Sequence, residues 1–223
     1  MRTQKDWDRR IRWWIRQPYP AVGRRKFMTI VRCLIAPGDV WRVAAAYAIA
    51  RYGHLEQVRD EPKPDGSPRF YFDHPRAVAY MLMVELQMRN WKAIVEALLH
   101  DIIEDSFILD ALGMQKLFGP DVAQGLRMVS RRPKAGFHAR LKTYGVATDL
   151  IVKLCDRIHN NLTLSGCTIE KQRKSVRESR AKYLPLADQL IAMLPKSRKW
   201  QGEFLKRFLL TSIEEAERGL ARQ

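Results

Sequence analysis

The stretch Ala97-Leu98-Leu99-His100-Asp101-Ile102-Ile103-Glu104-Asp105 decides the fold predicted for this chain. Its apolar residues recur at helical spacing and predict the middle and end of a buried helix: Ile94, Ala97, Leu98 and Ile102. Its polar residues lie mostly three or four positions apart, so they share another face of that helix: His100, Asp101, Glu104 and Asp105. Carboxylates this close repel one another unless a positive charge lies among them, which a bound metal ion would supply. A His-Asp pair also arises by chance, so the choice depends on other residues.

Length and composition predict a globular protein of one substantial domain. The chain has 223 residues, of which 46% are hydrophobic and 29% are charged. Its three cysteines, Cys33, Cys155 and Cys167, form no CxxC pair and argue for a reducing compartment. No secretory signal is apparent at the N-terminus, and charged residues interrupt the apolar segment 26–50, so we expect no membrane span and a cytoplasmic protein.

Helical periodicity dominates the whole chain, and no segment alternates as a strand would. Helices are predicted over residues 7–15, 23–34, 40–52, 74–88, 91–103, 122–129, 147–161, 169–182, 184–194 and 204–218, with a short one between Ser106 and Phe118. Residues 59–69 hold three prolines and a glycine and predict a loop, and residues 131–145 look basic and irregular. The predicted fold class is therefore all-α.

The N-terminal region is strongly basic. Residues 1–42 hold eleven Lys or Arg and three Asp or Glu, which gives +8 of the net charge of +16. An apolar stripe at helical spacing runs through it: Trp7, Ile11, Trp14 and Ile15. We expect this stripe to pack on the domain, because two tryptophans and two isoleucines are costly to leave in water. The alternative is a surface that docks on nucleic acid or on a membrane.

Two more polar residues stand where apolar ones are expected. His74 begins a helix after the proline-rich loop, and Asp156 lies inside the largely apolar segment 151–160. Together with His100 and Asp101 they make two imidazoles and two carboxylates. Mixed nitrogen and oxygen ligands suit Mn²⁺, Fe²⁺ or Zn²⁺, and carboxylates with water favour octahedral Mn²⁺. A divalent ion held this way can activate water and polarise a phosphoryl oxygen.

These residues carry a resemblance to the HD phosphohydrolase superfamily, whose signature is H…HD…D. Residues 99–105 are similar to the LLHDxxED motif of the hydrolase domain of RelA/SpoT proteins, and residues 153–160 are similar to that family's KLxDRxHN motif. Lesser matches follow in the same order along about residues 45–190: His54 with residues 57–59, Asp73-His74-Pro75, Phe118-Gly119, and Glu178-Ser179 with residues 183–187.

The resemblance implies an all-α fold and a hydrolase that removes the 3′-pyrophosphate of ppGpp and pppGpp, giving GDP or GTP and pyrophosphate. It implies Mn²⁺ as cofactor, with Zn²⁺, Fe²⁺ or Mg²⁺ as alternatives, held by His74, His100, Asp101 and Asp156. Glu104 and Asp105 would handle water and protons. The substrate-side residues would be Arg59, Asn160, Thr163 and Tyr183, and Arg157 would support the site by pairing with a carboxylate.

The predicted organisation is a basic helical extension (residues 1–40), a single HD-type helical domain (41–195) and a C-terminal helix packed on it (196–223). Only about thirty residues follow residue 190, so we expect a stand-alone alarmone hydrolase without a nucleotidyl-transfer domain. The longer loop before His74, and Ser130-Arg131 where the family often has Thr-Lys, leave substrate specificity open.

Two alternatives remain. One is an HD phosphohydrolase of another nucleotide, such as ppApp or a dNTP. The other is a basic protein that uses an HD scaffold to bind nucleic acid. If the N-terminal stripe packs on the domain, we expect only weak and non-specific nucleic-acid binding through the basic N-terminus. The sequence predicts no particular oligomeric state.

Overall fold

A computed structural model describes residues 3–105 and 110–222, with the side chains of Asp105 and Ala111 excepted. Within these ranges the regular structure is helical, and the only β-type pairing is an isolated bridge between Val58 and Phe70. The predicted all-α fold class is thus confirmed. No helix in the described ranges is long and apolar enough to cross a bilayer.

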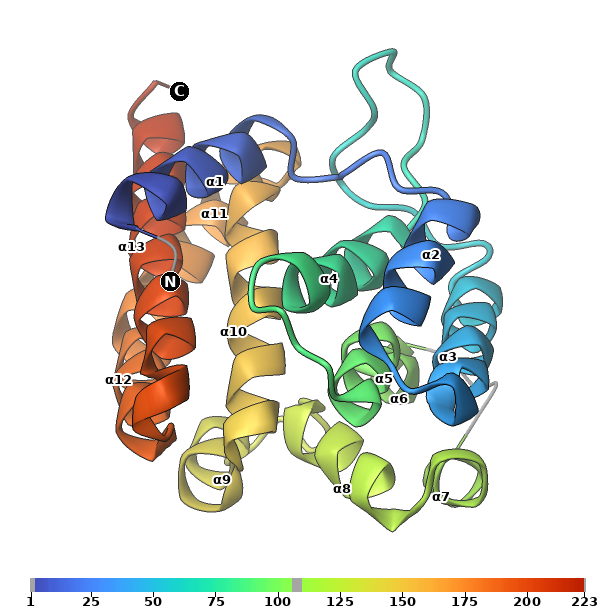
Figure 1. The fold of residues 1–223 in the computed structure, drawn as a ribbon. Coiled ribbons are helices and arrows are strands. Elements are labelled where there is room, and N and C mark those ends of the chain that lie inside the picture. The colour runs from blue at the N-terminus through green and yellow to red at the C-terminus, as the bar shows by residue number, and fades with distance from the viewer. Residues whose placement is uncertain (1–2, 106–109, 223) are drawn as a thin grey trace. The chain divides into compact units, whose positions relative to one another are not determined.

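The chain divides into two compact units, which are described separately (Figure 1). The terminal unit comprises Met1–Pro20, Arg59–Arg69 and Leu154–Gln223, and the central unit comprises Ala21–Val58 and Phe70–Lys153. The boundary between them falls inside one helix, α10 (Ala147–Leu162). The predicted limits 1–40, 41–195 and 196–223 remain predictions.

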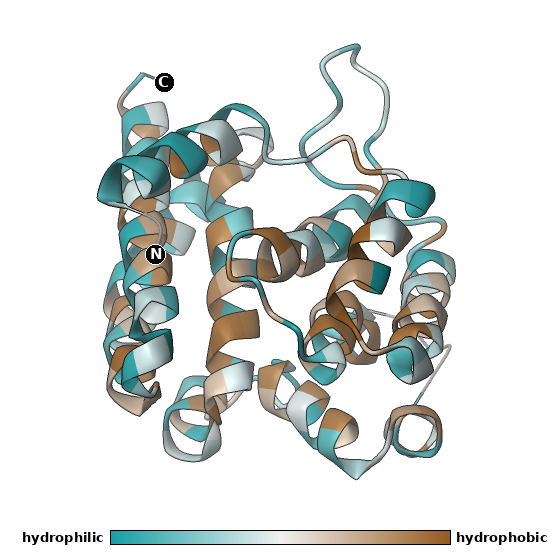
Figure 2. Cartoon of the chain, viewed as in Figure 1, coloured by the Kyte–Doolittle hydropathy of each residue, from teal (hydrophilic) through white to brown (hydrophobic). Residues whose placement is uncertain are grey.

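The terminal unit is organised around its longest helix, α13 (Lys199–Ala221). The helices and the π-helical turn that accompany it are α1 (Gln4–Arg16), α11 (Ile169–Glu178), the turn Ser179–Tyr183 and α12 (Leu184–Met193). Thr3 begins α1 through a capping box with Asp6, because each accepts a backbone N–H of the other. Figure 2 shows α1 as mostly hydrophilic with apolar patches, as expected for an amphipathic helix.

The apolar stripe of α1 packs on α13, so the prediction of packing is confirmed. Trp7 meets Phe204 edge-on at 5.8 Å between ring centroids, and Trp14, fully buried, lies 6.4 Å from Phe208. An ion pair between Arg207 on α13 and Asp8 on α1 (2.7 Å) borders this contact.

The central unit surrounds the buried helix α5 (Trp91–Leu99). Its other helices are α2 (Arg24–Leu34), α3 (Val40–Gly53), α4 (Asp73–Val84), α6 (Ile102–Asp105), α7 (Ala111–Phe118), α8 (Pro120–Val129), α9 (Phe137–Tyr144) and the first part of α10. Helix α5 packs against α3, α4 and α8. Every residue from Ala93 to His100 is buried, so α5 is the core of this unit.

The structure corrects the predicted helix over residues 91–103. Helix α5 ends at Leu99, and α6 begins only at Ile102, so His100 and Asp101 form a turn between two helices. The cause is local: the ring of His100 contacts the carbonyl of Ala97 (2.9 Å) and competes with the backbone for that acceptor. The segment 131–145 was also wrongly expected to be irregular throughout, because it contains α9. The predicted loop over 59–69 is present.

Candidate functional site

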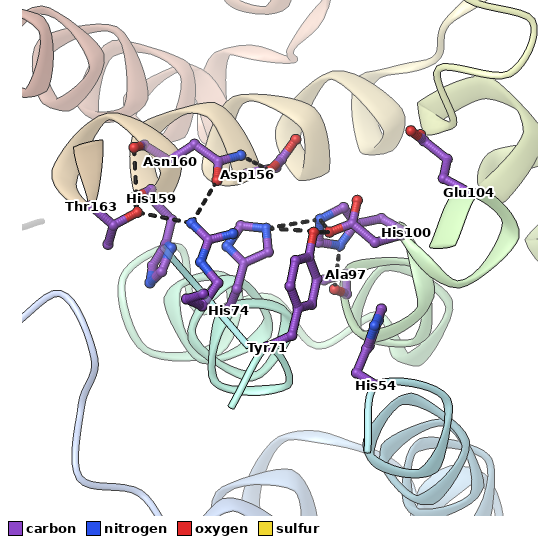
Figure 3. Close-up of polar contacts among 12 residues, drawn as sticks. His54, Tyr71, His74, Ala97, His100, Glu104, Asp156, His159, Asn160 and Thr163 are labelled. Atoms are coloured by element: carbon purple, nitrogen blue, oxygen red, sulfur yellow. Dashed lines mark hydrogen bonds and ion pairs between the residues drawn. The ribbon is translucent and has the colours of Figure 1, made fainter. Parts of the chain in front are cut away.

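Three of the predicted metal ligands converge in the central unit. His74 comes from the first turn of α4, and His100 and Asp101 come from the turn after α5. The Nε2 atoms of the two histidines are 3.2 Å apart, and Asp101 Oδ2 lies 3.2 Å from His100 Nε2 and 3.6 Å from His74 Nε2. All three side chains are buried, and one donor atom from each lies within 4.8 Å of the others (Figure 3). This spacing suits ligands that point at one small ion.

The tautomer of His100 fits a metal ligand. Its Nδ1 lies 2.9 Å from the carbonyl oxygen of Ala97, and since a carbonyl only accepts, Nδ1 carries the proton. In the neutral form of this tautomer, Nε2 has a lone pair directed at His74 and Asp101. A backbone carbonyl that holds the far nitrogen of a histidine is the usual partner of a metal-binding imidazole.

Tyr71 is a member of this cluster that the sequence did not indicate. Its hydroxyl donates a hydrogen bond of 2.9 Å to Asp101 Oδ2, and its ring lies 4.6 Å from the ring of His54 (Figure 3). Tyr71 precedes α4 and is thirty residues from Asp101, so no helical spacing connects the two. The contact depends on the packing of α4 against α5.

The two predicted proton-transfer residues lie just after this turn. Glu104 is half-buried, its backbone N–H donates to the carbonyl of Asp101 (3.0 Å), and its carboxylate accepts the N–H of Arg131. The backbone of Asp105 ends α6, and its side chain lies outside the described part of the structure. The catalytic roles of both residues stay predictions.

The terminal unit brings together four other predicted residues. Asn160 lies one turn after Asp156 on α10 and donates to its carboxylate (2.6 Å). From the loop, Arg59 donates through Nη2 to Asn160 Oδ1 (3.1 Å) and to Thr163 Oγ1 (3.0 Å) (Figure 3). Residues about a hundred positions apart thus form one polar network around the guanidinium of Arg59. A guanidinium group is well suited to binding phosphate oxygens.

Arg157 and Tyr183 form a second, more buried arrangement in the same unit. Arg157 donates to Glu178 Oε2 (2.7 Å) and to Ser175 Oγ (2.9 Å), so it pairs with a carboxylate as expected. Its guanidinium lies 4.2 Å from the ring centroid of Tyr183, which is fully buried in the π-helical turn. The supporting role of Arg157 and the substrate contact of Tyr183 stay predictions.

The residues that follow α1 border the Arg59 network. His159 Nε2 donates to the carbonyl of Pro18 (3.0 Å), and its ring meets Tyr19 edge-on at 5.0 Å. The guanidinium of Arg69 stacks on the ring of Tyr19, 3.8 Å from its centroid. Burial raises the pKa of the Tyr19 phenol, partly offset by the charge of Arg59. His159 therefore has a packing and hydrogen-bonding role, and nothing in the sequence pointed to its contact with Tyr19.

The charges of the loop are also partnered. The ammonium of Lys171 lowers the pKa of Asp60, with which it forms an ion pair of 2.5 Å. Burial raises the pKa of the neighbouring Glu61 despite the positive charge of Arg69. The backbone N–H of Arg59 donates to the carbonyl of Arg69 (2.9 Å), which closes the base of the loop. The backbone of Arg59 is thus anchored at the base of the proline-rich loop.

No protein-family model matches the chain. The chain does match curated proteins. It is 31% identical over 173 residues to the bifunctional (p)ppGpp synthase/hydrolase SpoT of Escherichia coli, and the match covers 72% of this chain and 23% of that protein. It is 32% identical over 154 residues to a guanosine-3′,5′-bis(diphosphate) 3′-pyrophosphohydrolase of Haemophilus influenzae (64% and 21%). It is 33% identical over 174 residues to a probable GTP pyrophosphokinase of Mycobacterium leprae (73% and 20%). The chain therefore spans less than a quarter of the length of these relatives.

A solved structure resembles the chain over more of its length. It is a metazoan ortholog of SpoT, described as hydrolysing ppGpp, with a TM-score of 0.56 and 23% sequence identity. The match covers 78% of this chain and 94% of the metazoan chain. At this identity the likeness concerns the fold, which is in agreement with the all-α arrangement of helices described above.

Proposed function

Because the chain is a relative of the RelA/SpoT-type HD hydrolases, we propose that it is a metal-dependent 3′-pyrophosphohydrolase of ppGpp-like nucleotides. The observation that carries the proposal is the buried His74, His100 and Asp101 cluster, whose donor atoms lie within 4.8 Å of one another. The names of two relatives support the choice of substrate, since one is a (p)ppGpp synthase/hydrolase and the other a guanosine-3′,5′-bis(diphosphate) 3′-pyrophosphohydrolase. The products would be pyrophosphate and GDP, or GTP from pppGpp.

A divalent ion would be held by His74, His100 and Asp101, with Asp156 of α10 as the predicted fourth ligand. The donors are two imidazole nitrogens and carboxylate oxygens, a set that suits Mn²⁺ and also admits Fe²⁺, Zn²⁺ or Mg²⁺. When bound, the ion supplies Lewis-acid polarisation of the phosphoryl group and a lowered pKa for water. The hydroxyl of Tyr71 would orient Asp101 toward this role, since it donates to the carboxylate at 2.9 Å.

The remaining residues would bind substrate and move protons. Hydrolysis adds water across the bond between the 3′ oxygen and phosphorus: the hydroxyl goes to pyrophosphate, and the 3′ oxygen leaves with a proton. We assign removal of the proton from water and its delivery to the leaving oxygen to Glu104 and Asp105. Arg59 would bind phosphate oxygens, and its contacts with Asn160 and Thr163 would fix the plane of its guanidinium.

The direct test is incubation of the purified chain with Mn²⁺ and ppGpp, with the products separated by chromatography. We expect GDP and pyrophosphate in equal amounts, and no release after treatment with a chelator. A parallel panel of ppApp and dNTPs tests the alternative substrates, and faster turnover of one of them would reassign the substrate while keeping the reaction class. A chain that binds metal but hydrolyses none of these nucleotides would refute the proposal.

Two variants separate metal binding from proton transfer. Asp101→Ala removes a charged ligand and is expected to abolish both bound metal and turnover. Glu104→Gln keeps the size of the side chain but cannot transfer the proton, so turnover should fall on the order of 10²-fold or more while metal content stays near that of the wild type. Full metal content in Asp101→Ala, or a wild-type rate in Glu104→Gln, would show that the assignment is wrong.

A further inference from the structure

The central unit has a pocket of about 310 Å³ where α2, α3 and the residues before α4 meet. Its walls include Arg24, Tyr47, Arg51, Leu55, Phe70 and Arg76. None of the three clustered residues His74, His100 and Asp101 lines it. The volume lies at the lower end of the range of small-molecule sites, and the proposed hydrolysis gives this pocket no role.

The pocket carries an excess of positive charge. Three guanidinium groups line it, against a single carboxylate, Asp73, which pairs with Arg76 at 2.7 Å. Among the residues that the structure describes, Arg24 and Arg51 form no ion pair, and both are exposed. Two guanidinium groups that face the same pocket without a counter-ion repel each other, and an anion between them would remove that repulsion.

The start of α2 adds to this charge. Helix α2 begins at Arg24, and Gly23 before it provides no side chain to cap the helix. Its first turn holds Arg24, Arg25 and Lys26 and no acidic residue, and Figure 2 shows this turn as hydrophilic. The first backbone N–H groups of a helix have no partner within it, and its positive end favours anions over cations. Three cations at this position are therefore unfavourable without an anion nearby.

The pocket is also lined by apolar residues that are partly open to solvent. Phe70 and Leu55 are each 55% exposed, and the buried Tyr47 also lines the pocket. Neighbouring Tyr52, in the adjoining hollow over α3, is 68% exposed. Exposed aromatic rings next to guanidinium groups suit a ligand with a planar, weakly polar part, because both groups stack on flat rings.

From these observations we infer that the pocket binds a purine nucleotide, with its phosphates at Arg24, Arg51 and the start of α2 and its base against Phe70 and Leu55. A mononucleotide joins an anionic group and a planar ring in one molecule of the size that such pockets hold. This binding site is separate from the proposed catalytic residues and does not depend on the hydrolysis proposed above.

The test is titration calorimetry of the full chain with GTP in the presence of EDTA, so that no metal contributes to binding. Arg24→Ala/Arg51→Ala removes the two unpaired guanidinium groups, and Arg25→Ala is the matched control, which loses an equal kind of charge from the same helical turn outside the pocket. We expect the double variant to weaken GTP binding by about tenfold or more and the control by no more than about twofold. Guanosine and tripolyphosphate should each bind more weakly than GTP.

Thermal melting of each variant checks that the fold is intact, and the single exposed change Arg51→Met replaces the double variant if that variant fails to fold. Unchanged ppGpp hydrolysis in the double variant would place the site apart from the catalytic residues. Absence of GTP binding to the wild type below about 1 mM, or an equal loss in Arg25→Ala, would overturn the inference. Tripolyphosphate binding as tightly as GTP would show a phosphate site without recognition of the base, which also contradicts it.

Discussion

At the residue scale, Asp101 is the side chain that contacts the other members of the central cluster, His74, His100 and Tyr71. One of its oxygens, Oδ2, lies 3.2 Å from His100 Nε2 and accepts a hydrogen bond from the hydroxyl of Tyr71. A carboxylate held by a neighbour keeps its lone pairs directed at one point, which lowers the entropic cost of binding an ion there. The geometry of the cluster thus depends on a tyrosine that has no place in the H…HD…D pattern.

Tyr71→Phe tests this dependence, because phenylalanine keeps the ring beside His54 and removes only the hydroxyl. We expect Mn²⁺ affinity or turnover to fall by about 10- to 100-fold, the usual loss when a partner of a metal ligand is removed. Metal titration and the dependence of the rate on Mn²⁺ concentration measure the effect, and excess Mn²⁺ should restore part of the activity. Tyr144→Phe makes the same chemical change at an exposed ring and serves as the control. Equal metal affinity in both variants would remove Tyr71 from the site.

Some residues of the candidate site could be predicted from the sequence, and others could not. His74, His100 and Asp101 were predictable because a known motif names them, and the structure brings them together. Arg59, Asn160 and Thr163 were also predicted, and they form one network. Tyr71 and Tyr19 were missed, because a phenol that contacts a distant segment leaves no periodic pattern in the sequence.

At the scale of elements, short-range interactions decide where helices end, and periodicity alone does not detect this. The apolar spacing of residues 94–102 continues across His100 and Asp101, although the backbone turns there. That turn is what directs both side chains toward His74, so the error in the predicted helix falls at the candidate site itself. Departures from regular helix at functional positions are expected, because a site needs side-chain directions that a continuous helix does not provide.

Two buried carboxyl groups of the central unit, Asp149 on α10 and Glu96 on α5, make a pH-dependent contribution to stability. Asp149 on α10 is 4% exposed, and burial raises its pKa to about 6 from 3.8, although it accepts the N–H of Val146. Burial, and secondly the charge of Asp149, raise the pKa of Glu96 on α5 well above its usual value. An acid with a raised pKa keeps its proton in the folded state, so its stabilising contribution is complete below about pH 4 and is lost as the pH rises through 6.

Asp149→Asn should therefore become more stable relative to the wild type as the pH rises from 4 to 7.5. A difference of about two pKa units corresponds to about 3 kcal/mol in the free energy of unfolding. Urea unfolding of both proteins across this pH range measures the difference between them. Glu203→Gln changes an exposed carboxylate on α13 and should show no such trend. A constant difference between Asp149→Asn and the wild type at all pH values would contradict the assignment of the raised pKa.

At the scale of the whole molecule, the two ends of the chain contribute to one compact unit. The terminal unit joins α1 to α13 through the contacts of Trp7 and Trp14 with two phenylalanines, although nearly two hundred residues separate these helices. Helical periodicity predicted that α1 has an apolar face, but not which helix would cover it, because a stripe on one helix carries no information about its partner. Lys5, Arg9, Arg12 and Arg16 of α1 are exposed and account for part of the net charge of +16.

This packing favours a structural role for α1 over a role as a nucleic-acid arm, and substitutions on the two faces of the helix test the choice. Trp14→Ala leaves a large cavity beside Phe208 and should lower the free energy of unfolding by about 3–5 kcal/mol. Arg12→Ala, at an exposed position of the same helix, should change the free energy of unfolding by no more than about 0.5 kcal/mol.

Deletion of residues 1–20 should lower the melting temperature further, because it uncovers the aromatic face of α13. Binding of RNA or DNA to the full chain should be weak and should fall steeply with salt, since it depends on counterion release. If the truncated chain instead melts like the full chain and loses tight nucleic-acid binding, α1 is a nucleic-acid arm and its tryptophans are not needed for the fold.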